Sequence, residues 1–334
     1  MNIGVDAGAL SITDNRLKLG VYWVNVNLLR ELSKIDKTNT YYLYSFIPIE
    51  ENFGPRMLNK VLRPASGWFS LRLPLELSLH PVDVFLGLSQ AIPVSKCRNI
   101  GFIYDLGFLH HPEAYPESAT KLKKQTEDLI KRSDHIVCIS QVVKNDVITT
   151  YGKKNITVAY PGVDNTFTSS GAKYKNKNPY FLFVGALKRG KNIPFLLRSF
   201  AKFLKQIKKP YDLILVGSDY WLDPGISFGP HVKFLGFVED KILASLYRGA
   251  LAFVSPSLWE GFCLPAAEAL SCGTAVIASK TGAFPEIVGK SGTLVDPTNE
   301  EELTKAFHTY AKKISIQPKK FSWSTFAHTV HKLL

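Results

Sequence analysis

The stretch 255-SPSLWEGFCLPAAEALSCGTAVIASKTGAFPEIVG-289 contains the pattern that decides the fold of this chain. An apolar, β-prone run at 251–254 precedes the helix-forming part, and a second run follows at 274–278, as expected for buried strands. Between them, Pro265 suits the first turn of a helix and Gly273 its C-terminal end, so a helix is predicted over about 265–272. A strand, a loop, a short helix and another strand are typical of a parallel α/β sheet.

Two glutamates stand around the start of this helix. Glu260 lies just before it, and Glu268 lies about one turn inside it. A helix rises roughly 1.5 Å per residue, so both carboxylates can face one ligand lying across the helix N-terminus. That terminus offers free backbone N–H groups and the positive end of the helix dipole, which favour a phosphate. An ordinary strand–loop–helix unit would account for the helix, but not for this set of residues at these offsets.

The acidic pair resembles the E-x7-E signature of glycosyltransferase family 4, the retaining glycosyltransferases with the GT-B fold. The surrounding residues 260–279, EGFCLPAAEALSCGTAVIAS, are similar to that family almost position by position. The resemblance covers nearly the whole chain. It implies an α/β protein with two Rossmann-like, doubly wound parallel-sheet domains that face each other across a cleft. The alternation of apolar strands and helical segments along the chain favours the same architecture.

The chain of 334 residues, 46% of them hydrophobic, is long enough for two domains, each with its own core. We expect residues 1–165 to form the N-terminal, acceptor-side domain, with 315–334 returning to it as a C-terminal helix. The polar, lysine-rich stretch 166–179 is predicted to be the linker. Residues 180–314 are expected to form the C-terminal, nucleotide-sugar-binding domain.

The resemblance implies transfer of a hexose from a nucleoside-diphosphate sugar to an acceptor hydroxyl, with retention at the anomeric carbon. Mannose is slightly favoured, with glucose and galactose as alternatives. The acceptor is expected to be a glycan or a lipid-linked glycan in polysaccharide, lipopolysaccharide or glycolipid synthesis. Family members need no metal, so neither a metal nor a cofactor is expected. A GT-B nucleotide-sugar epimerase and a non-catalytic nucleotide-sugar-binding protein remain as alternatives.

The family positions also imply roles for single residues. Glu268 is expected to bond the ribose, and Glu260 to hold the sugar. Lys191 matches a phosphate-binding lysine, while Arg189 stands one residue before the family's arginine, where this chain has Gly190; two cations in such a loop also occur by chance. Cys263 replaces the usual glycine and either narrows the sugar pocket or has no effect. The further donor-binding residues that the resemblance implies are Gly261, Phe262, Cys263, Leu264, Gly185, Gly20 and Val238.

Tyr104 and Asp105 stand where the family usually has a His-Asp pair. A tyrosine hydroxyl both donates and accepts hydrogen bonds and stays neutral near pH 7. We therefore expect Tyr104 to be a hydrogen-bond partner of the sugar or the acceptor, and Asp105 to orient the loop or meet the acceptor hydroxyl. The alternative is that Tyr104 closes its strand with the ring packed inward.

The formal net charge is +13, of which +10 lies in residues 166–334. This excess suits anionic partners such as phosphates or acidic lipid, with a solvated surface as the default interpretation. No nucleic-acid-binding motif is present, so nucleic acid is not an expected partner. Residues 55–79 mix basic and apolar side chains, and either face a membrane or acceptor or, the favoured interpretation, pack on the first domain. No apolar run reaches about 18 residues, which predicts a cytoplasmic protein, at most peripheral on the inner face of the membrane.

Overall fold

The computed structural model of the chain describes residues 1–219 and 226–334. It contains two compact units, each with its own parallel sheet. Unit 1 comprises residues 1–109, 117–162 and 322–334, and unit 2 comprises residues 110–116 and 163–321. Both sheets have helices in their crossover connections, so the predicted class of two Rossmann-like, doubly wound units is confirmed.

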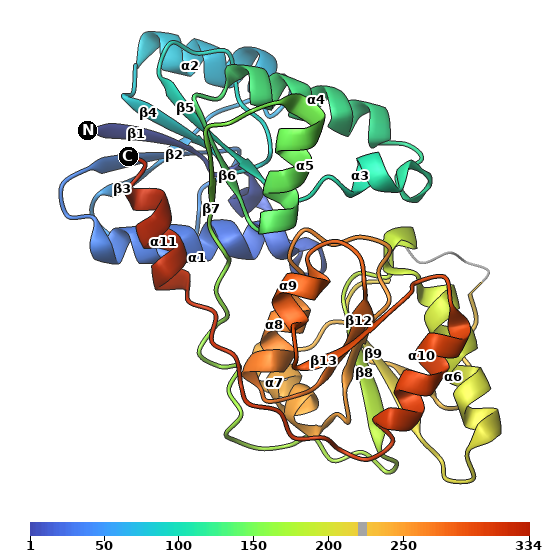
Figure 1. Ribbon diagram of the computed structural model, residues 1–334. Helices are drawn as coiled ribbons and strands as arrows, with labels where there is room; N and C mark the ends of the chain where they lie inside the picture. Colours follow the sequence, from blue (N-terminus) through green and yellow to red (C-terminus); the bar gives the residue numbers. More distant parts are fainter. Residues whose placement is uncertain (220–225) are drawn as a thin grey trace. The chain divides into compact units, whose positions relative to one another are not determined.

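The sheet of unit 1 has the strand order β3-β2-β1-β4-β5-β6-β7 with parallel neighbours. Helices on both faces bury its apolar strands. Figure 1 shows α1 and α11 together on one face and α2, α4 and α5 towards the other. The strands are β1 (Asn2–Asp6), β2 (Thr40–Ser45), β3 (Met57–Val61), β4 (Val84–Gly87), β5 (Arg98–Ile103), β6 (His135–Cys138) and β7 (Ile156–Val158). The main helices are α1 (Gly20–Ile35), α2 (Leu73–Leu79), α3 (Gly107–His110), α4 (Ala119–Arg132), α5 (Gln141–Tyr151) and α11 (Trp323–His331).

The sheet of unit 2 has the order β10-β9-β8-β11-β12-β13 in the described part of the chain, again with parallel neighbours. Helices α6 and α10 pack together on one face, and α7, α8 and α9 lie towards the other (Figure 1). The strands are β8 (Tyr180–Val184), β9 (Asp212–Val216), β10 (Val232–Phe234), β11 (Phe253–Ser255), β12 (Val276–Ser279) and β13 (Gly292–Val295). The helices are α6 (Ile193–Gln206), α7 (Asp240–Gly249), α8 (Leu264–Ser271), α9 (Phe284–Val288) and α10 (Glu300–Thr309).

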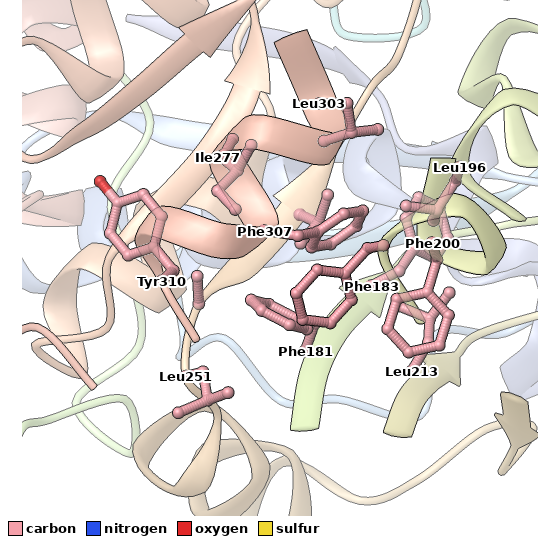
Figure 2. Close-up of a cluster of buried hydrophobic side chains, with 14 of the residues drawn as sticks. Phe181, Phe183, Leu196, Phe200, Leu213, Leu251, Ile277, Leu303, Phe307 and Tyr310 are labelled. Carbon is pink, nitrogen blue, oxygen red and sulfur yellow. The ribbon is translucent and has the colours of Figure 1, made fainter. Parts of the chain in front are cut away.

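An aromatic core fixes the sheet of unit 2 against α6 and α10, as Figure 2 shows. The ring of Phe181 on β8 meets that of Phe307 on α10 edge to face, with centroids 4.7 Å apart. Phe200 of α6 lies on the same cluster, 5.6 Å from Phe307. All three side chains are buried, and each contributes about 1.5–3 kcal/mol of burial free energy. The strand ends that follow this core are therefore held in fixed positions.

The unit boundaries differ from the predicted ones. Residues 166–179 do not form a free linker, because the Arg248 guanidinium donates to the carbonyl oxygens of Thr168 and Ala172, at 3.1 and 2.8 Å. The return to unit 1 begins at residue 322 rather than 315. Residues 315–321 stay on unit 2, where Ser271 Oγ donates to the carbonyl of Lys319 at 3.0 Å. The polar composition of residues 166–179 predicts a linker, but Arg248 of unit 2 binds backbone carbonyl groups of these residues.

Local predictions were more accurate around α8 than elsewhere. The helix predicted over about 265–272 is α8, shifted by one residue, and Gly273 follows it with φ +71°. In residues 55–79, the structure forms the edge strand β3, the π-helical turn η3 (Trp68–Arg72) and α2. Within the described residues, none of the helices combines the length and apolarity needed to cross a bilayer.

Candidate active site

The strand order of unit 2 reverses between β8 and β11, which are neighbours in the sheet. From β8 the chain moves to β9 on one side, and from β11 it moves to β12 on the other. Loops that leave such a pair of strands diverge to opposite faces, and open α/β sheets bind ligands at this point. The loop after β8 carries Lys191 and the loop after β11 carries Glu260. The topology therefore brings together two residues that are 69 positions apart.

Lys191 and Glu260 form an ion pair between Nζ and Oε1, with both side chains largely buried. A backbone hydrogen bond of 2.9 Å from Leu258 N to Gly190 O joins the two loops directly beside this pair. Partial burial strengthens the attraction between the two charges, compared with an ion pair that is fully exposed to water. The pair holds an ammonium group and a carboxylate in fixed positions at the ends of β8 and β11.

Two glycines allow the backbone to pass close to this pair. Gly217, at the end of β9, has φ +133°, and a Cβ added there would lie 2.2 Å from the carbonyl oxygen of Gly185. Gly282 has φ +57°, and its Cβ would lie 2.4 Å from the carbonyl oxygen of Glu260. Any side chain at either position would displace the loop that it meets. Gly185 is therefore the first residue of the loop after β8, and the backbone of Gly217 packs closely against it.

Helix α8 begins beside Glu260 with an unusual backbone conformation. Its N-cap residue, Cys263, has φ +69° and makes no side-chain capping hydrogen bond. The left-handed region favours glycine, and a residue with a side chain pays about 1–2 kcal/mol there. Burial raises the pKa of the Cys263 thiol to about 12, and Glu260 adds to this rise. The first N–H groups of α8 are the ones that a bound anion can meet.

Glu268 lies on α8 and is bound by a residue of the preceding helix. The Tyr247 hydroxyl donates to Glu268 Oε2 at 2.8 Å, which leaves Oε1 for a ligand. Burial raises the pKa of Glu268 to about 7, against the lowering effect of this hydrogen bond, and the charges of Asp240 and Asp164 raise it further. Near neutral pH, Glu268 therefore exchanges between its protonated and ionised forms.

The remaining predicted donor residues of unit 2 lie around the same loops. Arg189 begins the turn η5 (Arg189–Lys191) and is exposed. Phe262 is buried, with its ring edge to face with Phe321 at 5.9 Å. Gly261 and Leu264 flank Phe262 and Cys263 at the start of α8, and Val238 follows β10 in the loop before α7. Gly20 belongs to unit 1, where it is the first residue of α1.

The structure corrects the prediction for Tyr104. Its hydroxyl is buried inside unit 1 and donates to the carbonyl oxygen of Leu88 at 2.7 Å, with Asn25 Oδ1 at 3.4 Å. The ring closes strand β5 with its hydroxyl turned inward, so it is not presented to a sugar. Asp105 Oδ1 accepts from the backbone N–H of Gly107 at 3.0 Å, which orients the loop after β5.

Three residues near this site were not predicted. Tyr247 binds Glu268, but the contact joins two helices and leaves no local signal in the sequence. The ring of His110 stacks on Trp259, with centroids 3.6 Å apart and planes at 14°, next to Glu260. The paired histidines at 110–111 were a signal for this contact, although their position differs from that of the family histidine.

A pocket of about 310 Å³ opens in unit 1 and includes none of the predicted site residues. Leu10, Ile12, Val26 and Phe53 supply apolar parts of its wall, and Lys18 lies over the ring of Tyr22 at 5.2 Å. Arg189, Lys191, Glu260 and Glu268 lie instead in unit 2, in the loops after β8 and β11 and on α8, whereas Asp105 lies in unit 1. In the described ranges 1–219 and 226–334, no three His, Cys, Asp or Glu side chains come together as metal ligands.

Two Rossmann-like units with parallel sheets form a fold of the GT-B class. Residues 164–321 match the family model described as Glycosyl transferases group 1. The chain is 26% identical over 248 residues to O-antigen chain mannosyltransferase B of Escherichia coli, covering 66% of this chain and 63% of that relative. It is 27% identical over 301 residues to O-antigen chain mannosyltransferase RfbU of Salmonella typhimurium, covering 83% and 82%. These matches show that residues 164–321 resemble the group 1 glycosyltransferases, within a chain made of two parallel-sheet units.

Solved structures show the same fold at low identity. Sucrose-phosphate synthase from Thermosynechococcus elongatus superimposes with a TM-score of 0.76 at 18% identity, over 99% of this chain and 98% of that one. Anabaena HepE, solved in complex with UDP and glucose, gives a TM-score of 0.69 at 18% identity, over 99% and 98%. The fold predicted from the E-x7-E stretch is thus confirmed along the whole chain.

Proposed function

We propose that this protein transfers a hexose, with mannose favoured, from a nucleoside-diphosphate sugar to a hydroxyl of a polysaccharide or lipopolysaccharide acceptor. The observation that carries the proposal is the Lys191–Glu260 pair at the ends of β8 and β11, beside the N-terminus of α8. Two relatives named as O-antigen mannosyltransferases support mannose and a glycan acceptor. The complex of HepE with UDP and glucose supports a nucleotide-sugar donor.

The donor diphosphate is assigned to Lys191, the first N–H groups of α8 and, from the exposed turn, Arg189. A diphosphate needs cations and N–H donors, and the helix N-terminus supplies both a dipole and free donors. Lys191 is already oriented by Glu260, so little side-chain entropy is lost when phosphate replaces part of that contact. Positive charge placed where the leaving diphosphate gains charge lowers the barrier to transfer.

Glu268 is assigned to the ribose and Glu260 to the transferring sugar. With Oε2 held by Tyr247, Glu268 keeps Oε1 to accept from a ribose hydroxyl. In the transfer, the bond from the anomeric carbon to the phosphate oxygen breaks and the diphosphate keeps the electron pair. The acceptor oxygen then bonds to that carbon, and its proton passes to an oxygen of the departing diphosphate. The proposal includes retention at the anomeric carbon and action without a metal. It also includes the specific hexosyltransferase subclass and membership of family 4.

The acceptor is proposed to be a glycan or lipid-linked glycan, and the site of action the cytoplasm, at the inner face of the membrane. The test is a panel of nucleotide sugars with and without a mannose-terminated acceptor, following release of nucleoside diphosphate. We expect release only when both substrates are present. Release without an acceptor, or interconversion of the donor sugar, would favour the epimerase. Binding without turnover would favour a non-catalytic protein. Activity that EDTA abolishes and manganese restores would contradict metal independence.

A further inference from the structure

We infer that residues 163–174, the crossover segment, position Tyr247 and, through it, Glu268. The segment follows directly on Gly162, where unit 1 ends, and belongs to unit 2. The inference deepens the proposed function and rests on it, because Glu268 is the residue assigned there to the donor ribose. It makes Phe167 and Arg248 positioning residues, since they act on Glu268 through Tyr247 and not on the substrate.

The ring of Tyr247 is held between two other aromatic rings. Phe167, from the crossover segment, meets it edge to face with centroids 5.9 Å apart, and Phe253 on β11 meets it at 6.0 Å with planes at 60°. All three side chains are buried. Edge contacts of this kind favour one orientation of a ring, in addition to the burial of its area. In the orientation that they hold, the Tyr247 hydroxyl donates to Glu268 Oε2 at 2.8 Å.

Arg248 fixes the crossover segment against the same helix. Its guanidinium donates to the carbonyl oxygens of Thr168 and Ala172. Gly171, between these two residues, has φ +120°, and a Cβ there would lie 3.2 Å from Cζ of Arg248. The segment therefore turns closely around a guanidinium that is only 8% exposed and needs acceptors where it is buried. Because Arg248 follows Tyr247 in α7, these contacts hold the segment beside the Tyr247 ring.

The crossover segment also brings a charge towards Glu268. Burial is the main cause of the raised pKa of Glu268, and the carboxylates of Asp240 on α7 and Asp164 on the segment raise this pKa further. The hydrogen bond from Tyr247 acts in the other direction and lowers the pKa of Glu268. Two parts of one segment thus have opposite effects on one carboxyl group, because Phe167 supports the hydrogen bond and Asp164 supplies a like charge.

The thiols of Cys263 and Cys272 also interact with Glu268. Burial raises the pKa of both thiols to about 12, so they stay neutral over the pH range in which Glu268 titrates. The protonation of Glu268 should therefore respond to Tyr247 and the two aspartates, and not to the thiols.

The test is a pH titration of the Glu268 carboxyl group by NMR on the isotopically labelled full chain, with its signal assigned by comparison with Glu268→Gln. Phe167→Leu keeps an apolar side chain but removes the ring edge that holds Tyr247. It should move the midpoint up by about 0.5 pH unit, part of the effect of one hydrogen bond. Asp164→Asn removes a like charge and should move the midpoint down by about 0.3 pH unit.

Two controls separate positioning from a general loss of stability. Phe203→Leu changes another buried ring of unit 2, on α6 and on the face of the sheet away from α7 (Figure 1). It should lower the free energy of unfolding but leave the Glu268 midpoint unchanged. Asp128→Asn on α4 removes a carboxylate from unit 1 and should also leave it unchanged. Midpoints that stay fixed in Phe167→Leu and Asp164→Asn, or that move in the same direction in both, would overturn the inference.

Calorimetric titration of GDP and UDP over the same pH range distinguishes this inference from the proposed function. Affinity that follows the Glu268 midpoint in each variant would support both. If the midpoints move as predicted but the affinity of both nucleotides does not change with pH, the crossover segment still positions Glu268. The assignment of Glu268 to the donor ribose would then be the part that is wrong.

Discussion

At the strand-order reversal of unit 1, between β1 and β4, polar side chains are bound by their own unit. Asp6 ends β1 and accepts from Trp68 Nε1 at 3.1 Å, and Tyr104 donates to the carbonyl of Leu88 just after β4. At the reversal of unit 2, between β8 and β11, a lysine and a glutamate instead face each other beside a helix N-terminus. The same topology therefore gives a group of buried polar side chains in one unit and a pair of opposite charges in the other. Topology alone does not decide where a ligand binds.

The largest expected effect is on Glu260. Glu260→Gln keeps the shape of the side chain but removes the charge that orients Lys191. Loss of one preorganised electrostatic group commonly lowers turnover about 10²–10³-fold, and we expect kcat to decrease in this range with a smaller change in KM. Glu301→Gln is the control, because Glu301 pairs with Lys202 on the outer surface of unit 2. Turnover of Glu260→Gln within threefold of the wild type would show that this switch point is not the reacting site.

Lys191→Met should weaken nucleoside-diphosphate binding by at least about tenfold, since a hydrogen bond to a charged group contributes about 1.5–3 kcal/mol. Calorimetric titration at several salt concentrations measures this. The wild type should lose affinity as salt rises, and the variant should respond less. Lys202→Met is the matched control, because Lys202 pairs with Glu301 and belongs to neither the loop after β8 nor the loop after β11. Similar losses in both lysine variants would contradict the assignment.

The pH dependence of donor binding should follow Glu268. Its pKa is raised to about 7, mainly by burial, and the ionised form is the better acceptor for ribose hydroxyls. Because protonation opposes binding, affinity should increase between pH 6 and 8 by up to about tenfold, since the ionised fraction of a group with this pKa rises from about one tenth to about nine tenths.

Tyr247→Phe removes the hydrogen bond that lowers the pKa of Glu268, so the midpoint of this profile should move to higher pH. Tyr180→Phe also removes a buried hydroxyl, one that donates to the carbonyl of Leu246 at 2.7 Å. It should leave the midpoint unchanged. A profile that is flat in the wild type, or one that moves equally in both variants, would show that Glu268 does not govern donor binding.

Cys263→Gly tests the smallest effect. Glycine relieves the left-handed strain of about 1–2 kcal/mol but has a larger entropy loss on folding, about 0.5–1 kcal/mol. The buried side chain of Cys263 is also lost, which offsets the remaining gain, so we expect the free energy of unfolding to stay within about 0.5 kcal/mol of the wild type in urea titrations. Cys272→Gly should instead destabilise the protein clearly, because Cys272 is also buried but has φ −76° and relieves no strain. Equal losses of stability in the two variants would contradict strain at Cys263.

The sequence predicted the features that depend on neighbouring residues. Helix α8 and the strands around it follow from a long local motif, whereas the ion pair of Lys191 with Glu260 was not predicted. Prediction from the sequence failed where residues far apart in the chain determine the contacts of a side chain. The partners of Tyr104 are Leu88 and Asn25, which no local pattern indicates. Strand β3 was not recognised because Asn59 and Lys60 interrupt the apolar pattern of an edge strand that is only half buried.

The difference between the strand-order reversals of the two units is tested most directly by calorimetric titration. The nucleoside diphosphate that binds most tightly is titrated into the wild type, Glu268→Gln and Tyr104→Phe. The carboxylate of Glu268 lies beside the donor loops, whereas the Tyr104 hydroxyl is bound within unit 1. We predict at least about a tenfold loss of affinity for Glu268→Gln, as expected for a charged acceptor, and a change below twofold for Tyr104→Phe. Equal affinities in all three proteins, or a larger loss in Tyr104→Phe, would contradict a donor site at the ends of β8 and β11.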